Sequence, residues 1–392
     1  VKNRQKRPKK PWFSYELQKQ KSLLDKKRKI FLKNSTEKNE KDLRFEKKSY
    51  NENLKIAEKK YYAEKIEKAG SNSKAIWAVI NESLSRKRKN FTITKKIIFE
   101  GKEYTDNFDI AQIFNSHFKE AAYNISSKIQ AGPDFRTYLF KDPECETKMD
   151  FLGTNPAETL KLINSLSNKK SSGFDKISSN LIKRCNYSLC NPITFLINLS
   201  FSEGIFPKNL KIGKLTPLHK RDERTNVANF RPISQLSCIS TIIEKNIKLQ
   251  MNNHFKEHNV ISKFQSGFRK SHGTMHSLIS TRAIIEKELQ QKKFVCLVSF
   301  DQEKAFDLID CEKILPEKLS YYGMSSKATS YLKSFFNSRK QFVCFNRTNS
   351  DLTDLHNISV TQGSTLGPNS FSTYVNDLPS VSNNCSTIMF AD

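Results

Sequence analysis

Hydrophobic residues in the first part of the chain recur at helical spacing. Tyr50, Leu54, Ala57 and Tyr61 follow one another at intervals of four, three and four residues, with lysines between them. This spacing places the four side chains on one face of an α-helix and the lysines on the others. We therefore expect residues 11 to about 70 to be helical.

Local signals then predict where the next elements begin and end. Gly70 favours the end of the helical region, and Ser71 or Ser73 is expected to cap a further helix. A short hairpin with its turn at Gly101 should follow, because apolar residues flank a Glu-Gly-Lys sequence. Asp106 is then placed to cap another helix.

Beyond residue 156 the pattern changes to apolar helices that alternate with short strand-like runs. We expect helices near residues 157–165, 189–202 and 238–255. The clearest strand is residues 294–300, because Phe-Val-Cys-Leu-Val-Ser-Phe is typical of a buried strand in an α+β protein. We place the main domain boundary at 156, between a basic, mainly helical region (1–156) and an α+β domain (157–392).

Charge is concentrated at the start of the chain. The formal net charge is +27, and residues 1–50 hold 18 Lys and Arg against 6 Asp and Glu. Such a surplus suits a polyanionic partner such as nucleic acid, because each neutralised phosphate releases counterions. The alternative is a solvated, charged helical face. No apolar run approaches the roughly 20 residues of a transmembrane helix, so we expect no membrane partner.

The cysteines and the chain ends indicate an intracellular piece of a longer protein. No pair has Cys-x-x-Cys spacing and none lies in a Cys/His cluster typical of zinc, so we expect reduced thiols. No signal peptide opens the sequence, which fits the nucleus or the cytoplasm. The chain begins at Val1 and ends at Asp392, directly after a strand-like run, and we interpret both ends as cuts. The cysteines are Cys145, Cys185, Cys190, Cys238, Cys296, Cys311, Cys344 and Cys385.

Two aspartates are candidates for metal binding. Asp301 directly follows the predicted strand 294–300, and Asp392 follows a second strand-like run, Ser386–Ala391. A carboxylate at the exposed end of a buried strand is held rigidly and is a typical Mg²⁺ ligand. Two such groups would hold two ions, one activating a 3′-hydroxyl and one stabilising the leaving pyrophosphate. The alternative for either residue is a turn or a helix cap.

Six segments after residue 169 form an ordered series. They are Lys170-Ser-Ser-Gly-Phe-Asp-Lys-Ile177, Leu215–Lys220 with Asn229–Ser234, Phe264–Lys270, Asp301–Asp307, Gln362–Pro368 with Tyr374–Pro379, and Phe390–Asp392. The series resembles the reverse transcriptase domain of non-LTR (LINE-type, jockey-like) retrotransposons, and the Asp301 segment matches the first palm motif of that family. The resemblance predicts a right-hand polymerase, with fingers and an incomplete palm that lacks the thumb.

The resemblance implies an RNA-directed DNA polymerase that adds dNTPs to a primer 3′-hydroxyl. It implies two Mg²⁺ ions, with Mn²⁺ as a substitute, an RNA template and a DNA primer. Residues 1–156 look similar to the connector that follows the endonuclease, so an endonuclease domain is expected in the full-length element. The alternative is a catalytically inactive remnant that still binds nucleic acid. The oligomeric state is not predicted.

The resemblance also assigns roles to individual residues. Asp301 and Asp392 would be metal ligands and catalytic residues, with the backbone carbonyl of Gln302 completing the metal site. Lys220 and Arg231 would grip the triphosphate, since a guanidinium offers a planar fork to phosphate oxygens. The alternative for both cations is an ordinary surface position.

Further positions match the nucleotide pocket and the template contact. Phe306 would crowd the 2′ carbon of the sugar and exclude ribonucleotides, its alternative being a core phenylalanine. Gln362 and Gly363 would line the nucleotide pocket, where glycine allows close backbone approach. The predicted template contacts are Gln265, Gly267 and Arg269, and Asp307 is expected to brace the palm.

The sequence departs from the family pattern at the end of the chain and inside the palm. The third motif normally ends in two aspartates, of which this chain has one. Thr361 replaces the usual proline, and Ser299 interrupts an apolar run. Asn369 and Ser370 replace an apolar pair, and burying them without partners would cost a few kcal/mol (~2–7). These changes indicate a decaying copy.

Overall fold

The chain divides into two compact units, Val1–Thr92 and Ile93–Asp392. The computed structural model describes residues 10–84, 94, 96–128, 132, 134–139, 148–356, 360, 363–382 and 384–390. The boundary that we expect at 156 therefore lies inside the second unit. None of the described helices is long and apolar enough to cross a membrane.

The first unit contains three helices: α1 (Tyr15–Lys33), α2 (Glu37–Ala69) and α3 (Ser73–Ser83). The helical prediction for residues 11–70 is confirmed for 15–33 and 37–69, but residues 11–14 and the turn between α1 and α2 are not helical. Gly70 ends α2 with a φ of +52°, a conformation that glycine adopts readily. Asn72, and neither of the expected serines, caps α3 by accepting a hydrogen bond from the amide of Ala75.

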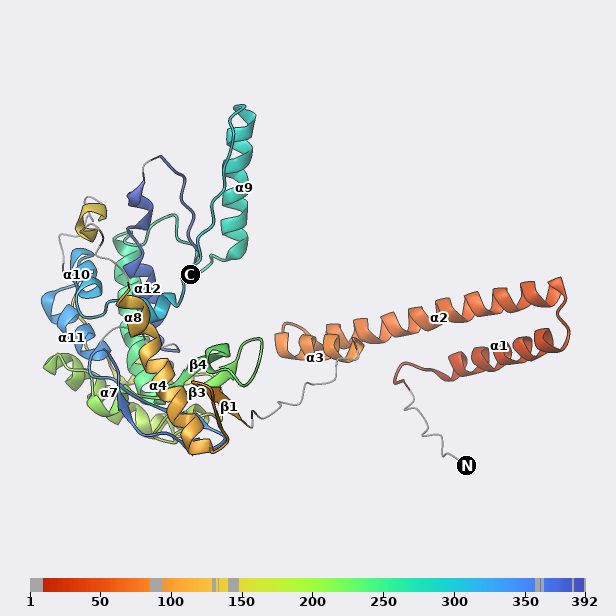
Figure 1. Ribbon diagram of the computed structural model, residues 1–392, viewed down its shortest axis with the longest axis horizontal. Helices are drawn as coiled ribbons and strands as arrows, with labels where there is room; N and C mark the ends of the chain where they lie inside the picture. Colours follow the sequence, from red (N-terminus) through yellow and green to blue (C-terminus); the bar gives the residue numbers. More distant parts are fainter. Residues whose placement is uncertain are drawn as a thin grey trace. The chain divides into compact units, whose positions relative to one another are not determined.

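Helices α1 and α2 lie side by side as a hairpin (Figure 1) with little apolar core. Leu17 is the only buried residue of α1, and α2 has none. Polar contacts cross the hairpin instead: the Nζ of Lys27 lies 2.9 Å from Asp42, and Asn53 donates a hydrogen bond of 3.2 Å to Gln20. Most of the α2 surface consequently faces solvent.

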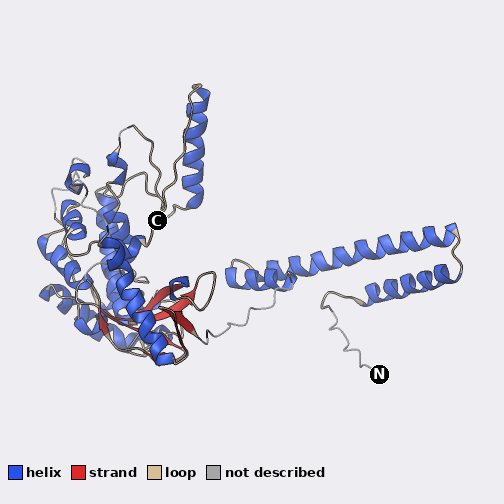
Figure 2. Ribbon diagram, in the orientation of Figure 1, coloured by secondary structure: helices blue, strands red, loops and turns tan. Residues whose placement is uncertain are grey.

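The second unit contains a twisted five-stranded sheet, gathered at one end of the unit in Figure 2. The strand order is β4-β3-β5-β6, and β7 also pairs with β5. Strands β3 and β5 are parallel, whereas the other pairs are antiparallel. The bounds are β3 (Ile212–His219), β4 (Phe230–Gln235), β5 (Lys340–Phe345), β6 (Thr348–Asn349) and β7 (Thr353–Asp354).

A separate hairpin and helix α4 (Asn107–Ser126) open the second unit as predicted. Strands β1 (Ile97–Phe99) and β2 (Lys102–Tyr104) pair across a turn in which Glu100 and Gly101 have positive φ. A turn in which both central residues have positive φ suits a two-residue hairpin loop. The carboxylate of Asp106 caps α4 by accepting hydrogen bonds from two amides.

Helices form two cores in the second unit. Phe114 of α4 packs edge-on against Phe230 of β4 at 4.9 Å, which joins α4 to the sheet. The larger core is built mainly by helices α5, α7, α8, α10, α11 and α12. The predicted helices near 157, 189 and 238 are confirmed. The helix bounds are α5 (Pro156–Asn164), α6 (Ser179–Arg184), α7 (Asn186–Glu203), α8 (Cys238–Glu257), α9 (Thr274–Gln290), α10 (Ile314–Tyr321), α11 (Ser326–Phe336) and α12 (Gly367–Tyr374).

Our prediction of a buried strand at residues 294–300 is wrong. The segment is extended but belongs to no sheet, and Phe294 and Phe300 are 105% and 85% exposed. Helix α9, which precedes it, has no buried residue and stands apart from the rest of the unit in Figure 1. An apolar run becomes a strand only where a neighbour pairs its backbone, and no described segment does so here.

Candidate active site

The loop that contains Gly363 lies against strand β4. Gly363 has a φ of +105°, and a Cβ atom at this position would come within 2.8 Å of the carbonyl oxygen of Ser234. Only glycine fits so close to another backbone. The loop predicted to line the nucleotide pocket thus touches the strand that carries Arg231.

Glu244 of α8 also holds the Gly363 loop in place, through hydrogen bonds. One carboxylate oxygen accepts a hydrogen bond of 2.7 Å from the hydroxyl of Ser364 and one of 2.6 Å from the amide of Thr365. Its other oxygen accepts from the hydroxyl of Ser240 at 2.9 Å. Glu244 is fully buried, so the carboxylate is satisfied by these donors in place of water. Its negative charge also favours the charged form of Arg339, whose pKa is lowered by burial.

The segment Lys170–Ile177 is anchored to the corner between β4 and α8. A Cβ atom on Gly173 would lie 2.8 Å from the carbonyl carbon of Leu236. The carboxylate of Asp175 accepts a hydrogen bond of 2.6 Å from the hydroxyl of Ser237. Two motifs that are far apart in the sequence thus meet one short corner, Ser234–Ser237.

Phe306 lies beside the Gly363 loop rather than deep in the core. Its ring stacks on Phe371 of α12 at 5.1 Å and meets Phe268 edge-on at 6.0 Å. Gly367 lies next to the same ring, and a Cβ atom there would make an ordinary contact with it at 3.7 Å. Phe306 is half-buried.

The two predicted triphosphate contacts lie on neighbouring strands. Arg231 of β4 pairs in register with Leu218 of β3, and the amide of Lys220, just after β3, bonds to the carbonyl of Asn229. Both cationic side chains are exposed. Their backbones are held by the sheet, while the charged ends are accessible to solvent.

The predicted template residues form one turn. The side-chain oxygen of Gln265 accepts a hydrogen bond of 2.7 Å from the amide of Gly267. The guanidinium of Arg269 donates to the carbonyls of Ser262 and Gln265 at 3.1 and 3.2 Å. Gln265 is fully buried and Arg269 half-buried, so in this structure the first supports the turn while the second retains an exposed part.

The predicted metal ligands are not brought together within the described residues. Asp301 and Gln302 are exposed and follow the unpaired run 294–300. Asp392, like Gln362, lies outside the described residues. No group of three or more His, Cys, Asp or Glu that could hold a metal occurs in the described part of the chain. The strand-end geometry expected for Asp301 is therefore absent from this structure.

A cavity of about 240 Å³ lies between α4, the sheet and residues 303–307 of the Asp301 segment. Its lining includes Pro232, Ser234, Lys304, Asp307 and His117. Burial, together with the positive charge of Lys304, lowers the pKa of His117. The cavity borders the Gly363 loop through Ser234, but neither Lys220 nor Arg231 lines it.

The buried ion pair between Lys318 and Asp377 was not predicted from the sequence. The Nζ of Lys318 bonds to the carboxylate of Asp377, which belongs to the Tyr374–Pro379 motif. Burial lowers the pKa of Lys318, and Asp377 opposes that effect. The neighbouring Asn376 bonds to the carbonyl of Val260 and the amide of Ser262, both at 2.8 Å. This motif therefore ties α10 to the turn of the template residues.

The polar pair inside the palm, Asn369 and Ser370, has hydrogen-bond partners. Asn369 donates a hydrogen bond of 2.7 Å to Asn252, and Ser370 donates one of 3.0 Å to the carbonyl of Leu366. The expected penalty of unpartnered burial is thus avoided.

Comparison with known proteins supports the resemblance that the motifs indicate. Residues 218–392 match the family described as reverse transcriptase (RNA-dependent DNA polymerase). The chain is 27% identical over 230 residues to a probable RNA-directed DNA polymerase from transposon BS of Drosophila melanogaster, covering 57% of this chain and 24% of that protein. It is 25% identical over 332 residues to the probable polymerase from transposon X-element of the same species, covering 81% and 35%.

A third relative is the RNA-directed DNA polymerase from mobile element jockey of Drosophila melanogaster, 26% identical over 230 residues, which cover 57% of this chain and 24% of that protein. The chain thus spans between 24% and 35% of the length of these relatives. The segment that matches the family, residues 218–392, begins near the end of β3 and contains strand β4, the Gly363 loop and the Phe306 cluster. Residues 218–392 therefore match the reverse transcriptase family, and the relatives that the chain resembles are named as polymerases of mobile elements.

Proposed function

We propose that this chain provides the fingers and palm of an RNA-directed DNA polymerase that extends a DNA primer with dNTPs on an RNA template. The contact between Gly363 and Ser234 supports this proposal most directly. It brings the loop expected to line the nucleotide pocket against the strand that carries Arg231. A nucleotide bound there would contact both the Arg231 side chain and the backbone at Gly363.

The residues around that contact would each bind a different part of the nucleotide. Lys220 and Arg231 would pair with the triphosphate, and Phe306 would lie against the sugar. Because Phe306 is stacked on Phe371, its position is fixed before the nucleotide arrives. Phosphoryl transfer depends mainly on such positioning and on charge neutralisation, so a rigid pocket is what the reaction requires.

A divalent metal is part of the proposal. Asp301, the carbonyl of Gln302 and Asp392 are the residues that would hold Mg²⁺, or Mn²⁺ in its place. The bound metal would activate the primer hydroxyl and neutralise the leaving pyrophosphate. An endonuclease elsewhere in the full-length element, and residence in the nucleus and cytoplasm, belong to the same proposal.

Primer extension tests the proposed activity. The chain, and a version extended through the rest of the element's polymerase, would be given an RNA template, a labelled DNA primer and dNTPs with Mg²⁺ or Mn²⁺. We expect extension by the longer protein, loss of it in Asp301→Asn, and retention in Glu312→Gln, which removes an equally exposed carboxylate. RNA binding without extension in either metal would replace this proposal with the binding-only alternative.

A further inference from the structure

The outward face of α2 carries more cationic than acidic residues. Between residues 38 and 60, Glu52 is the one exposed acidic residue, whereas eight exposed residues are cationic. Two of these eight form ion pairs within the helix, Lys41 with Glu37 and Arg44 with Glu40. The eight are Lys38, Lys41, Arg44, Lys47, Lys48, Lys55, Lys59 and Lys60.

The acidic residues of this part of α2 lie mostly on its inner face. Asp42 is half-buried and pairs with Lys27 of α1 across the hairpin. Glu46 and Glu58 are also half-buried. The helix thus separates its charges, with carboxylates toward the hairpin and cations toward solvent, so the whole unit presents a positive surface at α2.

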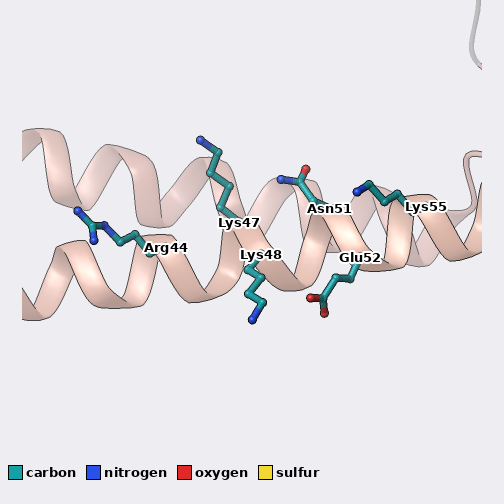
Figure 3. A pocket seen from close by; sticks show the side chains of 6 residues that line it. All are labelled: Arg44, Lys47, Lys48, Asn51, Glu52 and Lys55. Carbon is teal, nitrogen blue, oxygen red and sulfur yellow. The ribbon is translucent and has the colours of Figure 1, made fainter.

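Four of the cations, together with Asn51 and Glu52, line an open hollow of about 390 Å³ near the middle of the helix. Figure 3 shows Lys47 and Lys55 projecting from one edge of α2 and Lys48 from the opposite edge, with Arg44 at one end. The cluster extends over about 16 Å, since an α-helix rises about 1.5 Å per residue. One strand of a nucleic acid duplex presents a phosphate about every 3.4 Å, so several phosphates lie within reach of this cluster.

We propose that the outward face of α2 binds the phosphate backbone of nucleic acid without reading its sequence. Lysines dominate the face, and lysine neutralises phosphates as a point charge rather than recognising bases. An anionic membrane fits less well, because a membrane-bound helix needs a broad apolar face. The exposed large apolar residues on this stretch are two separated side chains, Phe45 and Ile56.

Binding measurements on the full chain test this proposal without any need for polymerase activity. The variant Lys47→Gln/Lys48→Gln/Lys55→Gln removes three cations, and glutamine has a helix propensity similar to that of lysine. Labelled oligo(U) RNA and a DNA duplex would be titrated at several salt concentrations. We expect weaker binding to both, and a slope of log affinity against log salt that falls by about one for each phosphate that the variant no longer neutralises.

A matched control removes three exposed lysines from the second unit, Lys161→Gln/Lys327→Gln/Lys333→Gln. This variant should bind nearly as the unaltered chain does, while circular dichroism verifies that both variants keep their helix content. Equal weakening by both triples would reduce the effect to net charge and overturn the proposal. Unchanged RNA and DNA binding by the α2 variant, with loss of binding to vesicles of anionic lipid, would overturn it in favour of a membrane surface.

Discussion

The buried carboxylate of Glu244 accepts a hydrogen bond of 2.7 Å from the hydroxyl of Ser364. This contact joins the middle of helix α8 to the loop of Gly363, although 120 residues separate the two partners in the sequence. The position of the proposed nucleotide pocket therefore depends on a residue that would not itself touch a nucleotide.

Replacing Glu244 with alanine should destabilise the second unit. The hydroxyls of Ser240 and Ser364 and the amide of Thr365 would lose their acceptor in the interior, at about 1–3 kcal/mol for each unsatisfied group. We expect the free energy of unfolding in urea to fall by about 3 kcal/mol or more. Glu257→Ala, an exposed change on the same helix, should stay within about 0.5 kcal/mol of the unaltered chain.

Glu244→Gln separates positioning from stability. The amide keeps one oxygen acceptor and should fold, but it places a donor against one of the three donors. In a polymerase-competent protein we expect a higher KM for dNTP with a smaller change in kcat. A KM equal to that of the parent protein, with the loop equally protected from proteolysis, would rule out a positioning role.

Gly363→Ala tests the close approach to β4. The new Cβ would have to displace the carbonyl of Ser234, and the positive φ would add strain of about 1 kcal/mol. Gly204→Ala is the matched control, since Gly204 also has positive φ (+68°) but nothing within 4 Å of the added atom. We expect Gly363→Ala to lower the urea midpoint clearly more than Gly204→Ala. Equal decreases would mean that φ strain alone explains both.

Acid should destabilise the second unit partly through His117. Its pKa is lowered in the folded protein, so the unfolded chain takes up a proton first as pH falls below about 6.5. The free energy of unfolding therefore decreases below that pH until the folded imidazole also protonates. His117→Gln should show a shallower decrease than the unaltered chain between about pH 7.5 and pH 5. Parallel curves, or the same flattening in the exposed His272→Gln, would contradict this assignment.

The unpaired apolar run 294–300 should promote association of the chain. Exposed, extended apolar segments pair readily with other strands. We expect Phe294→Ser/Leu297→Ser to reduce light scattering at high protein concentration while leaving the urea midpoint unchanged, because both side chains are exposed. Phe195→Ser changes an exposed phenylalanine on a helix and should leave the scattering as it was. Scattering that persists after the double substitution would show that another surface drives association.

Local signals predicted much of the secondary structure. Gly70 and Asp106 influence only the helix end next to them. A glycine after a helical pattern and an aspartate before one were therefore sufficient to predict where a helix ends or begins. Residues 294–300 show the limit of such signals. Their composition favours a strand, but pairing depends on a second segment that the run itself does not encode.

The candidate site was predicted by motif resemblance, whereas its supports were not. Gly363 was expected near the nucleotide, yet the reason for glycine there is the carbonyl of Ser234. Glu244 left one local trace, because it is the one acidic residue in the helical pattern of residues 238–255. Its partners in the Gly363 loop, Ser364 and Thr365, could not be inferred from that trace, because they lie more than a hundred residues away.

Gly173 and Gly363 approach the same corner, Ser234–Ser237, from opposite directions along the chain. The corner reaches its final form only when both segments have arrived, and contacts between such distant segments form slowly because long loops must close first. Refolding of the second unit should therefore bring most helices back before the nucleotide pocket is complete. A chain emerging from the ribosome would acquire its pocket only after residue 363 had been synthesised, however early its helices had formed.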